Sequence, residues 1–338
     1  MLARWVVAIA LLSSCTSSQP AVSIPTPHTP GPLGDTWTRD RGAWHEHTLS
    51  GPSPRYLASI TYDQARHDYV LFGGLTARGT SGETWTWDGR RWTLRRPAHS
   101  PPPRRGAAIA FDPVHRVVVL YGGLVPDQAE GTVAADTWTW NGNDWSEVGG
   151  VDPGPGRRED ASMVSTPDGV LLFGGREFNT KYYGDVWSFD GAKWTFVIGN
   201  TPRGPSGRAA AAVVWNPAQE ALLVFGGVAR NAAAGPGAQG VPLADTWVLT
   251  PPGWVAVRPQ GPPSLAFASA LWDAAGNRVL VMFGMHCPDP VNDLWGWEGN
   301  VAWSKIGSVA APARWGAAAA ADGSGDLVVF GGDDQAGC

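Results

Sequence analysis

Short apolar runs recur along the chain, and each ends in an aromatic residue followed by glycine. Such runs lie within residues 69–74, 116–123, 169–175, 221–227, 278–285 and 326–332. Brief apolar runs bounded by glycine, proline and asparagine are typical of buried strands, whereas a helix needs a longer uninterrupted window. The pattern therefore predicts a series of equivalent β-strands.

Further strand signals accompany these runs. An alanine-rich stretch such as 105–112 precedes the run, and an acidic residue two places before a tryptophan follows it. A second tryptophan comes after a short turn such as Asp88-Gly89, as a tight hairpin requires. We name the four expected strands a (alanine-rich), b (aromatic–glycine), c (acid-x-Trp) and d (second tryptophan). The unit repeats about every 47 to 58 residues, a spacing typical of propeller blades.

These units resemble the Kelch repeat, whose hallmark is a Gly-Gly doublet followed by spaced aromatic residues. The resemblance covers residues 35–332 and implies an all-β, six-bladed Kelch-type β-propeller. The sequence starts its repeats with a c and d pair, Asp35-Thr36-Trp37 and Trp44, and finishes them with an a and b pair. We therefore expect one propeller domain, 35–338, whose ring is closed when these two pairs share a sheet. The glycines expected to be structural are Gly73, Gly74, Gly122, Gly123, Gly174, Gly175, Gly226, Gly227, Gly284, Gly331 and Gly332.

The first residues read as export and anchoring signals. Arg4 precedes the apolar run Trp5–Leu12, which is shorter than the roughly 20 residues needed to span a bilayer, so residues 1–14 are predicted to be a signal peptide. Leu12-Ser13-Ser14-Cys15 resembles the bacterial lipobox, and this implies lipidation of Cys15 and a lipid-anchored, extracytoplasmic location in the bacterial cell envelope. An ordinary secretory signal is the alternative. Residues 15–34 are rich in serine, threonine and proline and are expected to form an extended tether.

Composition narrows the possible partners. The net charge is −5, three of the 25 basic residues are lysines, and like charges are not clustered. A nucleic-acid surface needs clustered positive charge, so this class of partner is not expected. We predict a monomer that touches the membrane through its lipid anchor alone.

One end of the predicted propeller carries the b–c and d–a connections, which vary in length, and we call it the loop face. Variable loops on a rigid scaffold are common binding sites. The loop 176–184 offers Tyr182 and Tyr183, and the same face should hold Glu159 and Asp160 as candidate acid–base residues or solvated ion-pair partners. Arginines at the starts of five a strands predict either a ring that binds an anionic group or a scaffold in which each arginine pairs with a nearby carboxylate or carbonyl. These arginines are Arg55, Arg105, Arg158, Arg208 and Arg314.

Catalytic and metal signals are weak. Radical copper oxidases of the galactose oxidase type are built on Kelch propellers, but they need a tyrosine cross-linked to cysteine, and no cysteine lies between Cys15 and Cys287. The sequence has no metal-ligand spacing and implies no cofactor. We therefore predict a non-enzymatic module that binds protein or carbohydrate through the loop face. The alternative is an enzyme acting on an acidic sugar, similar to the periplasmic Kelch sialic-acid mutarotases, with the arginines as a carboxylate clamp.

Two cysteines suggest a further covalent link. Cys287 and Cys338 both follow a b strand, in units that should be neighbours. An exported protein permits oxidation, so a disulfide between them is one prediction and two free thiols are the other.

Overall fold

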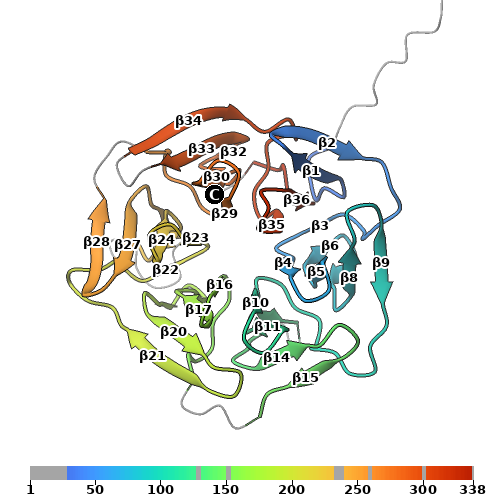
Figure 1. Cartoon of the computed structure of the whole chain (residues 1–338), viewed down its shortest axis with the longest axis horizontal. Coiled ribbons are helices and arrows are strands. Elements are labelled where there is room, and N and C mark those ends of the chain that lie inside the picture. The colour runs from blue at the N-terminus through green and yellow to red at the C-terminus, as the bar shows by residue number, and fades with distance from the viewer. Residues whose placement is uncertain are drawn as a thin grey trace, which may run out of the picture.

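The structure is a computed structural model and describes residues 29–126, 131–149, 154–231, 240–257, 261–298 and 302–336. In these residues six four-stranded antiparallel sheets stand around a central axis, each running outward from its a strand to its d strand (Figure 1). The all-β propeller predicted from the sequence is confirmed. The described part of the chain contains no helix with the length and apolar character of a membrane span.

The sheets follow one another along the chain as blades one to five. Blade one contains β4 (Ser59–Asp63), β5 (Asp68–Phe72), β8 (Thr84–Trp87) and β9 (Trp92–Arg95). Blade two contains β10 (Ala108–Asp112), β11 (Val117–Tyr121), β14 (Thr137–Trp140) and β15 (Trp145–Glu147). Blade three contains β16 (Ser162–Thr166), β17 (Gly169–Phe173), β20 (Val186–Phe189) and β21 (Trp194–Ile198). Blade four contains β23 (Ala212–Asn216), β24 (Ala221–Phe225), β27 (Thr246–Thr250) and β28 (Gly253–Val257). Blade five contains β29 (Ser269–Asp273), β30 (Arg278–Met282), β33 (Asp293–Glu298) and β34 (Ala302–Ser308).

Blade six combines strands from the two ends of the sequence. It contains β35 (Ala318–Ala321), β36 (Leu327–Phe330), β1 (Thr36–Asp40) and β2 (Ala43–His47), in the order β35-β36-β1-β2. The pairing of β1 with β36 sets Thr36 opposite Phe330, as the repeat pattern predicted. Leu33 adds to this connection, because its N–H donates to the carbonyl of Gly332 at 2.8 Å and its own carbonyl accepts from Arg55 N at 3.0 Å. Residues 31–34, which were predicted to belong to the tether, are therefore held against the propeller.

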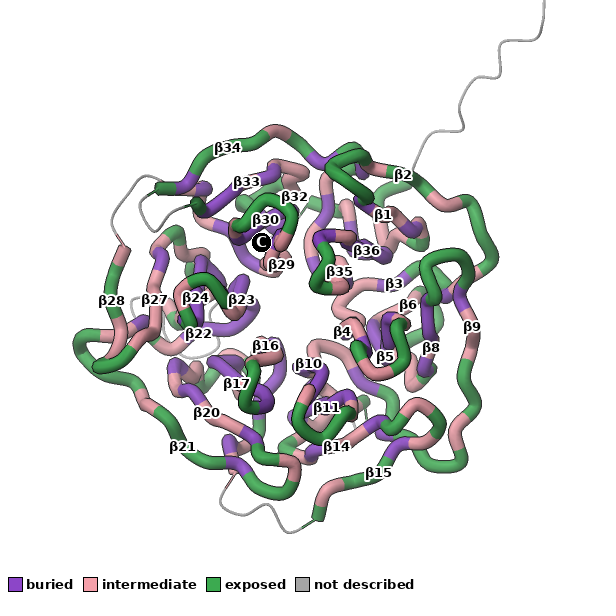
Figure 2. Tube along the Cα trace, viewed as in Figure 1, coloured by how far each residue is buried: buried purple, intermediate pink, exposed green. Residues whose placement is uncertain are grey.

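The recurring aromatic residue at the end of strand b joins five of the six blades to the next blade. Phe72 of blade one meets Trp145 of blade two edge to face, with ring centroids 5.5 Å apart. The same contact recurs as Tyr121–Trp194, Phe173–Trp254, Phe225–Trp303 and Phe330–Trp92, at 5.1 to 5.7 Å. Aromatic pairs of this geometry contribute about 0.5–1.5 kcal/mol beyond the area they bury. Figure 2 shows the result, with buried residues concentrated on the inner strands of each blade and exposed residues on the turns and outer strands.

The glycine that follows the aromatic residue is required by both its backbone conformation and its close contacts. Gly73 has φ +73°, and a Cβ there would collide with the carbonyl oxygen of Arg104 in the next blade. Blade five departs from this pattern, because its strand register puts Met282 in the aromatic position. Phe283 then takes the place of the first glycine with φ +60°. Gly284 is therefore the second glycine of its doublet, and Phe283 is not the aromatic residue of the repeat.

Candidate functional site

A ring of backbone hydrogen bonds surrounds the axis on the loop face. The residue two positions before each a strand adopts a positive φ of 52–61° and donates its N–H to the carbonyl of the equivalent residue in the preceding blade, at 2.8–3.2 Å. The six members are Leu57, Gly106, Asp160, Ala210, Phe267 and Gly316. Because each blade gives one donor and one acceptor, the ring fixes the relative positions of the residues that flank the axis on this face.

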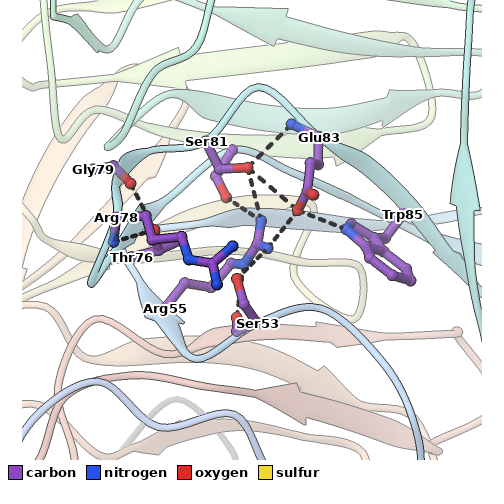
Figure 3. A network of polar contacts seen from close by, with 9 residues as sticks. Ser53, Arg55, Thr76, Arg78, Gly79, Ser81, Glu83 and Trp85 are labelled. Atoms are coloured by element: carbon purple, nitrogen blue, oxygen red, sulfur yellow. Dashed lines mark hydrogen bonds and ion pairs between the residues drawn. The ribbon is translucent and has the colours of Figure 1, made fainter.

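In five blades a buried arginine lies two residues before the ring position. In blade one, Arg55 Nη1 donates to the Gly73 carbonyl at 2.9 Å, and Nη2 donates to Glu83 Oε2 at 2.6 Å (Figure 3). The same oxygen of Glu83 accepts from Trp85 Nε1 at 3.0 Å. This network explains the acid-x-Trp motif, since the acid joins the arginine that precedes strand a to the tryptophan of strand c.

The network recurs around the propeller. The equivalent ion pairs are Arg104–Asp136, Arg158–Asp185, Arg208–Asp245 and Arg314–Asp35, at 2.6–2.9 Å, and these arginine side chains are at most 1% exposed. Burial alone would raise the pKa of the Asp35 carboxyl, but the hydrogen bonds and charge of Arg314, together with a hydrogen bond from Trp37, hold that pKa below its usual range. The arginines are therefore part of the scaffold and do not form the open anion-binding ring considered above.

The prediction for blade two was wrong by one residue. Arg104, not Arg105, lies two residues before the ring position Gly106 and forms the buried pair. Arg105 is half-buried, and its backbone bridges to Leu124. The sequence has two consecutive arginines before Gly106 and does not show which of them forms the ion pair. In the structure, the spacing from the ring position identifies Arg104.

Blade five lacks this network. Leu265 occupies the arginine position and is buried, so Asp293 pairs instead with Lys305 Nζ at 2.8 Å. In the other blades the equivalent tryptophan donates its Nε1–H to the acid. Trp295 Nε1 has no hydrogen-bond partner among the described residues. Blade five therefore departs from the other blades at two positions on the loop face. Leu265 stands in place of the arginine, and Phe283 stands in place of the first glycine.

A pocket of about 270 Å³ opens on the loop face beside blade five. Arg176 and Asn179 of blade three form its polar end, while Phe267 and Met285 of blade five and Trp315 of blade six are among its apolar lining residues. Trp315 is fixed by ring contacts to Phe267 at 5.3 Å and to Tyr56 at 5.1 Å. The pocket therefore draws on loops of several blades, which no single repeat could reveal.

Behind the polar end of the pocket, Arg176 contacts both acidic residues that the sequence singled out. Arg176 Nη2 lies 2.9 Å from Asp160 Oδ2, and its Nε lies 3.5 Å from Glu159 Oε1. Both carboxylates are buried, and burial together with the charge of Asp160 raises the pKa of Glu159 to about 7, with Arg176 opposing that shift. Arg176 also donates through Nη1 to Asn179 Oδ1 at 3.0 Å. Sequence reasoning placed Arg176 in the loop but missed its role as the partner of this acid pair.

The two candidate tyrosines have different surroundings. Tyr182 donates its hydroxyl to Asn179 Oδ1 at 3.4 Å, so it supports the polar end of the pocket. The ring of Tyr183 lies under the guanidinium of Arg158, 4.0 Å from the ring centroid, with Lys181 Nζ at 4.6 Å. Tyr183 thus packs on a scaffold arginine, and it is not among the residues that line the pocket.

Comparison with protein families assigns the chain. The model described as the KLHDC2/KLHL20/DRC7 Kelch-repeats domain matches residues 114–332. The chain belongs to this Kelch-repeat family. Membership suggests a Kelch propeller that binds protein partners. A comparison with curated proteins found no match.

Other predicted sites of this Kelch protein are only partly covered by the structure. The disulfide predicted between Cys287 and Cys338 stays a prediction, because Cys338 lies outside the described residues. Cys15 and the signal peptide also lie outside them. Within the described ranges no group of three or more His, Cys, Asp or Glu residues could hold a metal ion.

Proposed function

We propose that this Kelch propeller is an exported binding module, tethered to the bacterial membrane through Cys15, which holds a protein partner on its loop face. The observation that supports the binding role is the pocket between Arg176 and Trp315. Its apolar lining suits one or two apolar side chains of a partner, and Arg176 and Asn179 give it a polar end. The tether fits a module that works at a distance from the membrane surface.

Binding is favoured over the acidic-sugar enzyme. The enzyme hypothesis needs free guanidinium groups as a carboxylate clamp, yet Arg55, Arg158 and their equivalents already pair with carboxylates of the scaffold. Arg176 borders the pocket but also faces two carboxylates. Glu159 has a pKa suited to proton transfer, but it is 5% exposed and is not among the residues that line the pocket.

A selection experiment tests the proposal. A random peptide library displayed on phage would be selected on the mature protein, and the enriched peptides would be measured by fluorescence polarisation. We expect Trp315→Ala to weaken binding at least about tenfold, because an aromatic anchor of a binding pocket is lost. Val255→Ala, on the exposed outer strand β28, is the matched control and should bind normally. Equal binding to both variants, or failure to enrich any peptide, would contradict the proposal.

A further inference from the structure

A groove of about 470 Å³ lies between blades three and four, where β21 of blade three meets the c–d turn of blade four (Figure 1). Its volume falls within the range of about 300–1,000 Å³ that is usual for ligand sites. None of the residues that line it also lines the loop-face pocket. A role for this groove therefore does not depend on the function proposed above.

A short turn in blade three helps to open the groove. In blade one the a–b turn consists of residues 64–67, and its Arg66 lies against Gly142 in the c–d turn of blade two, so closely that a Cβ on the glycine would collide with it. In blade three the a–b turn consists of residues 167–168 and is therefore shorter. It lacks the position that Arg66 occupies, so no such side chain reaches from blade three over the c–d turn of blade four.

A leucine in blade four enlarges the same groove. In four other blades the residue of strand c that pairs with the d-strand tryptophan is itself aromatic, and the two ring centroids lie 5.0–5.5 Å apart, as in Trp87–Trp92, Trp140–Trp145, Phe189–Trp194 and Trp297–Trp303. In blade four the register puts Leu249 opposite Trp254, and Leu249 lines the groove. Because an isobutyl group is smaller than an indole or phenyl ring, the junction with blade three has room for a further ring.

Apolar side chains are left partly uncovered around this space. Leu171 of blade three is half-buried, whereas the equivalent residue of strand b is buried in each of the other five blades. Val197 of β21 is 48% exposed, and Pro251 and Pro252 line the groove from blade four. Apolar area that is open to water favours an apolar ligand that covers it.

One charged side chain borders the apolar groove. Glu220, in the a–b turn of blade four, is the charged residue among the described residues that line it. It is exposed and forms no ion pair within the described ranges. A positive charge on the ligand would be attracted to this carboxylate, whereas a negative charge would be repelled.

We propose that this groove binds an aromatic side chain of a partner protein in which a lysine or arginine adjoins the aromatic residue. The ring enters the space beside Leu249 and covers Leu171 and the two prolines, while the basic residue pairs with Glu220 at the rim. An aliphatic side chain would cover less of the apolar area, and an acidic neighbour would be repelled by Glu220. The contact complements in shape and charge a junction that other blades close with their own aromatic residue.

Short peptides titrated into the mature protein and followed by saturation-transfer NMR test this proposal. The probe is acetyl-Gly-Lys-Trp-Lys-Gly-amide. One control peptide replaces its tryptophan with leucine, and the other replaces both lysines with glutamate. We expect the probe to bind at least about tenfold more tightly than either control, because each control lacks one of the two contacts. No binding of the probe, or equal binding of either control, would overturn the proposal.

A variant copied from the other blades separates the groove from other surfaces. Leu249→Trp gives blade four the residue that blades one, two and five carry, and it should fill the groove. We expect at least about a tenfold loss of probe binding without loss of thermal stability. Val114→Trp, at a position that is 55% exposed and outside the groove, is the matched control and should bind normally.

A second variant keeps the site testable if Leu249→Trp does not fold. Glu220→Gln removes the carboxylate from an exposed side chain, so the fold should be retained and the probe should bind more weakly. Its affinity for the leucine control peptide should fall as well, since both peptides carry the lysines. Undiminished probe binding by whichever variant folds would refute the site.

Discussion

The indole Nε1 of Trp254 has no hydrogen-bond partner among the described residues, because Val186 occupies the position where four other blades carry a threonine. The tryptophan of strand d normally donates to the first residue of strand c in the preceding blade. Trp92–Thr36, Trp145–Thr84, Trp194–Thr137 and Trp303–Thr246 all make this bond at 2.9 Å. The junction between blades three and four therefore lacks a bond that four other junctions have.

Val186→Thr should stabilise the protein. The new hydroxyl would accept from Trp254 Nε1, and a buried hydrogen bond of this kind contributes about 1 kcal/mol. For a domain of this size the gain corresponds to a rise of roughly 2 °C in Tm, measurable by scanning calorimetry. Thr137→Val is the matched control, since it leaves Trp194 Nε1 unpaired and should lower Tm. A lower Tm for Val186→Thr would mean that the local packing cannot accept the hydroxyl.

Two neighbouring arginines should differ sharply in their importance for stability. Arg104→Ala leaves the Asp136 carboxylate without its buried partner, and breaking a pair of this kind costs about 3–5 kcal/mol. Arg105→Ala removes a half-buried side chain outside the network and should change the free energy of unfolding by about 0.5 kcal/mol or less. Urea unfolding of both variants measures the contrast. Equal losses would show that the pairing with Asp136 is not what stabilises this position.

Stability should depend on pH through Glu159. Burial and the charge of Asp160 raise its folded pKa to about 7, above the ordinary value of 4.5, although Arg176 and Arg105 oppose the shift. The folded state then holds the proton more tightly than the unfolded state. The resulting stabilisation is fully present below pH 4.5 and is lost as the pH rises through about 7.

Glu159→Gln isolates this effect, because glutamine stays neutral at every pH. We expect the wild-type protein to lose stability relative to this variant between about pH 4.5 and about 7, as measured by urea midpoints across that range. Glu147→Gln, on the exposed part of β15, should follow the wild-type profile and serves as the control. Parallel wild-type and Glu159→Gln profiles would rule out Glu159 as the titrating group.

The repeat made the fold predictable, while the sites depended on differences between repeats. Six similar strand patterns fix the blade, and the c–d pair at one end with the a–b pair at the other predicts the shared sheet seen between β1 and β36. The choice between Arg104 and Arg105 could not be made, because both residues precede the same glycine and only the three-dimensional spacing separates them. The partner of the arginines could have been found in the sequence, since the acid of each acid-x-Trp motif recurs as regularly as the arginine.

The pocket is harder to predict because it depends on residues from different blades. Trp315 and Arg176 line one pocket, yet they belong to repeats far apart in the chain. Such sites follow from comparing equivalent positions around the ring, which requires the exact strand register.

The disulfide prediction concerns the two cysteines near the closing blades. We expect the unfolded, unreduced mature protein to have no reactive thiol from Cys287 or Cys338. Cys338→Ser should lower stability, since a bridge that closes a loop of about 50 residues contributes roughly 4 kcal/mol in the chain-entropy model. Thiol titration in denaturant provides the measurement. Two reactive thiols in the wild-type protein would contradict the bridge.

Lipid anchoring predicts where the protein is found in a cell. Cys15→Ser removes the acceptor thiol while leaving the apolar run Trp5–Leu12 intact, so export can still begin but no acyl chain can be attached. We expect the native protein in the membrane fraction and the variant in the soluble extracytoplasmic fraction, because each acyl CH₂ that enters the bilayer contributes about 0.8 kcal/mol to membrane binding. Ser14→Ala keeps a small residue before the cysteine and should remain at the membrane. If Cys15→Ser stays bound as firmly as the native protein, the tether is held by something other than a lipid on this residue.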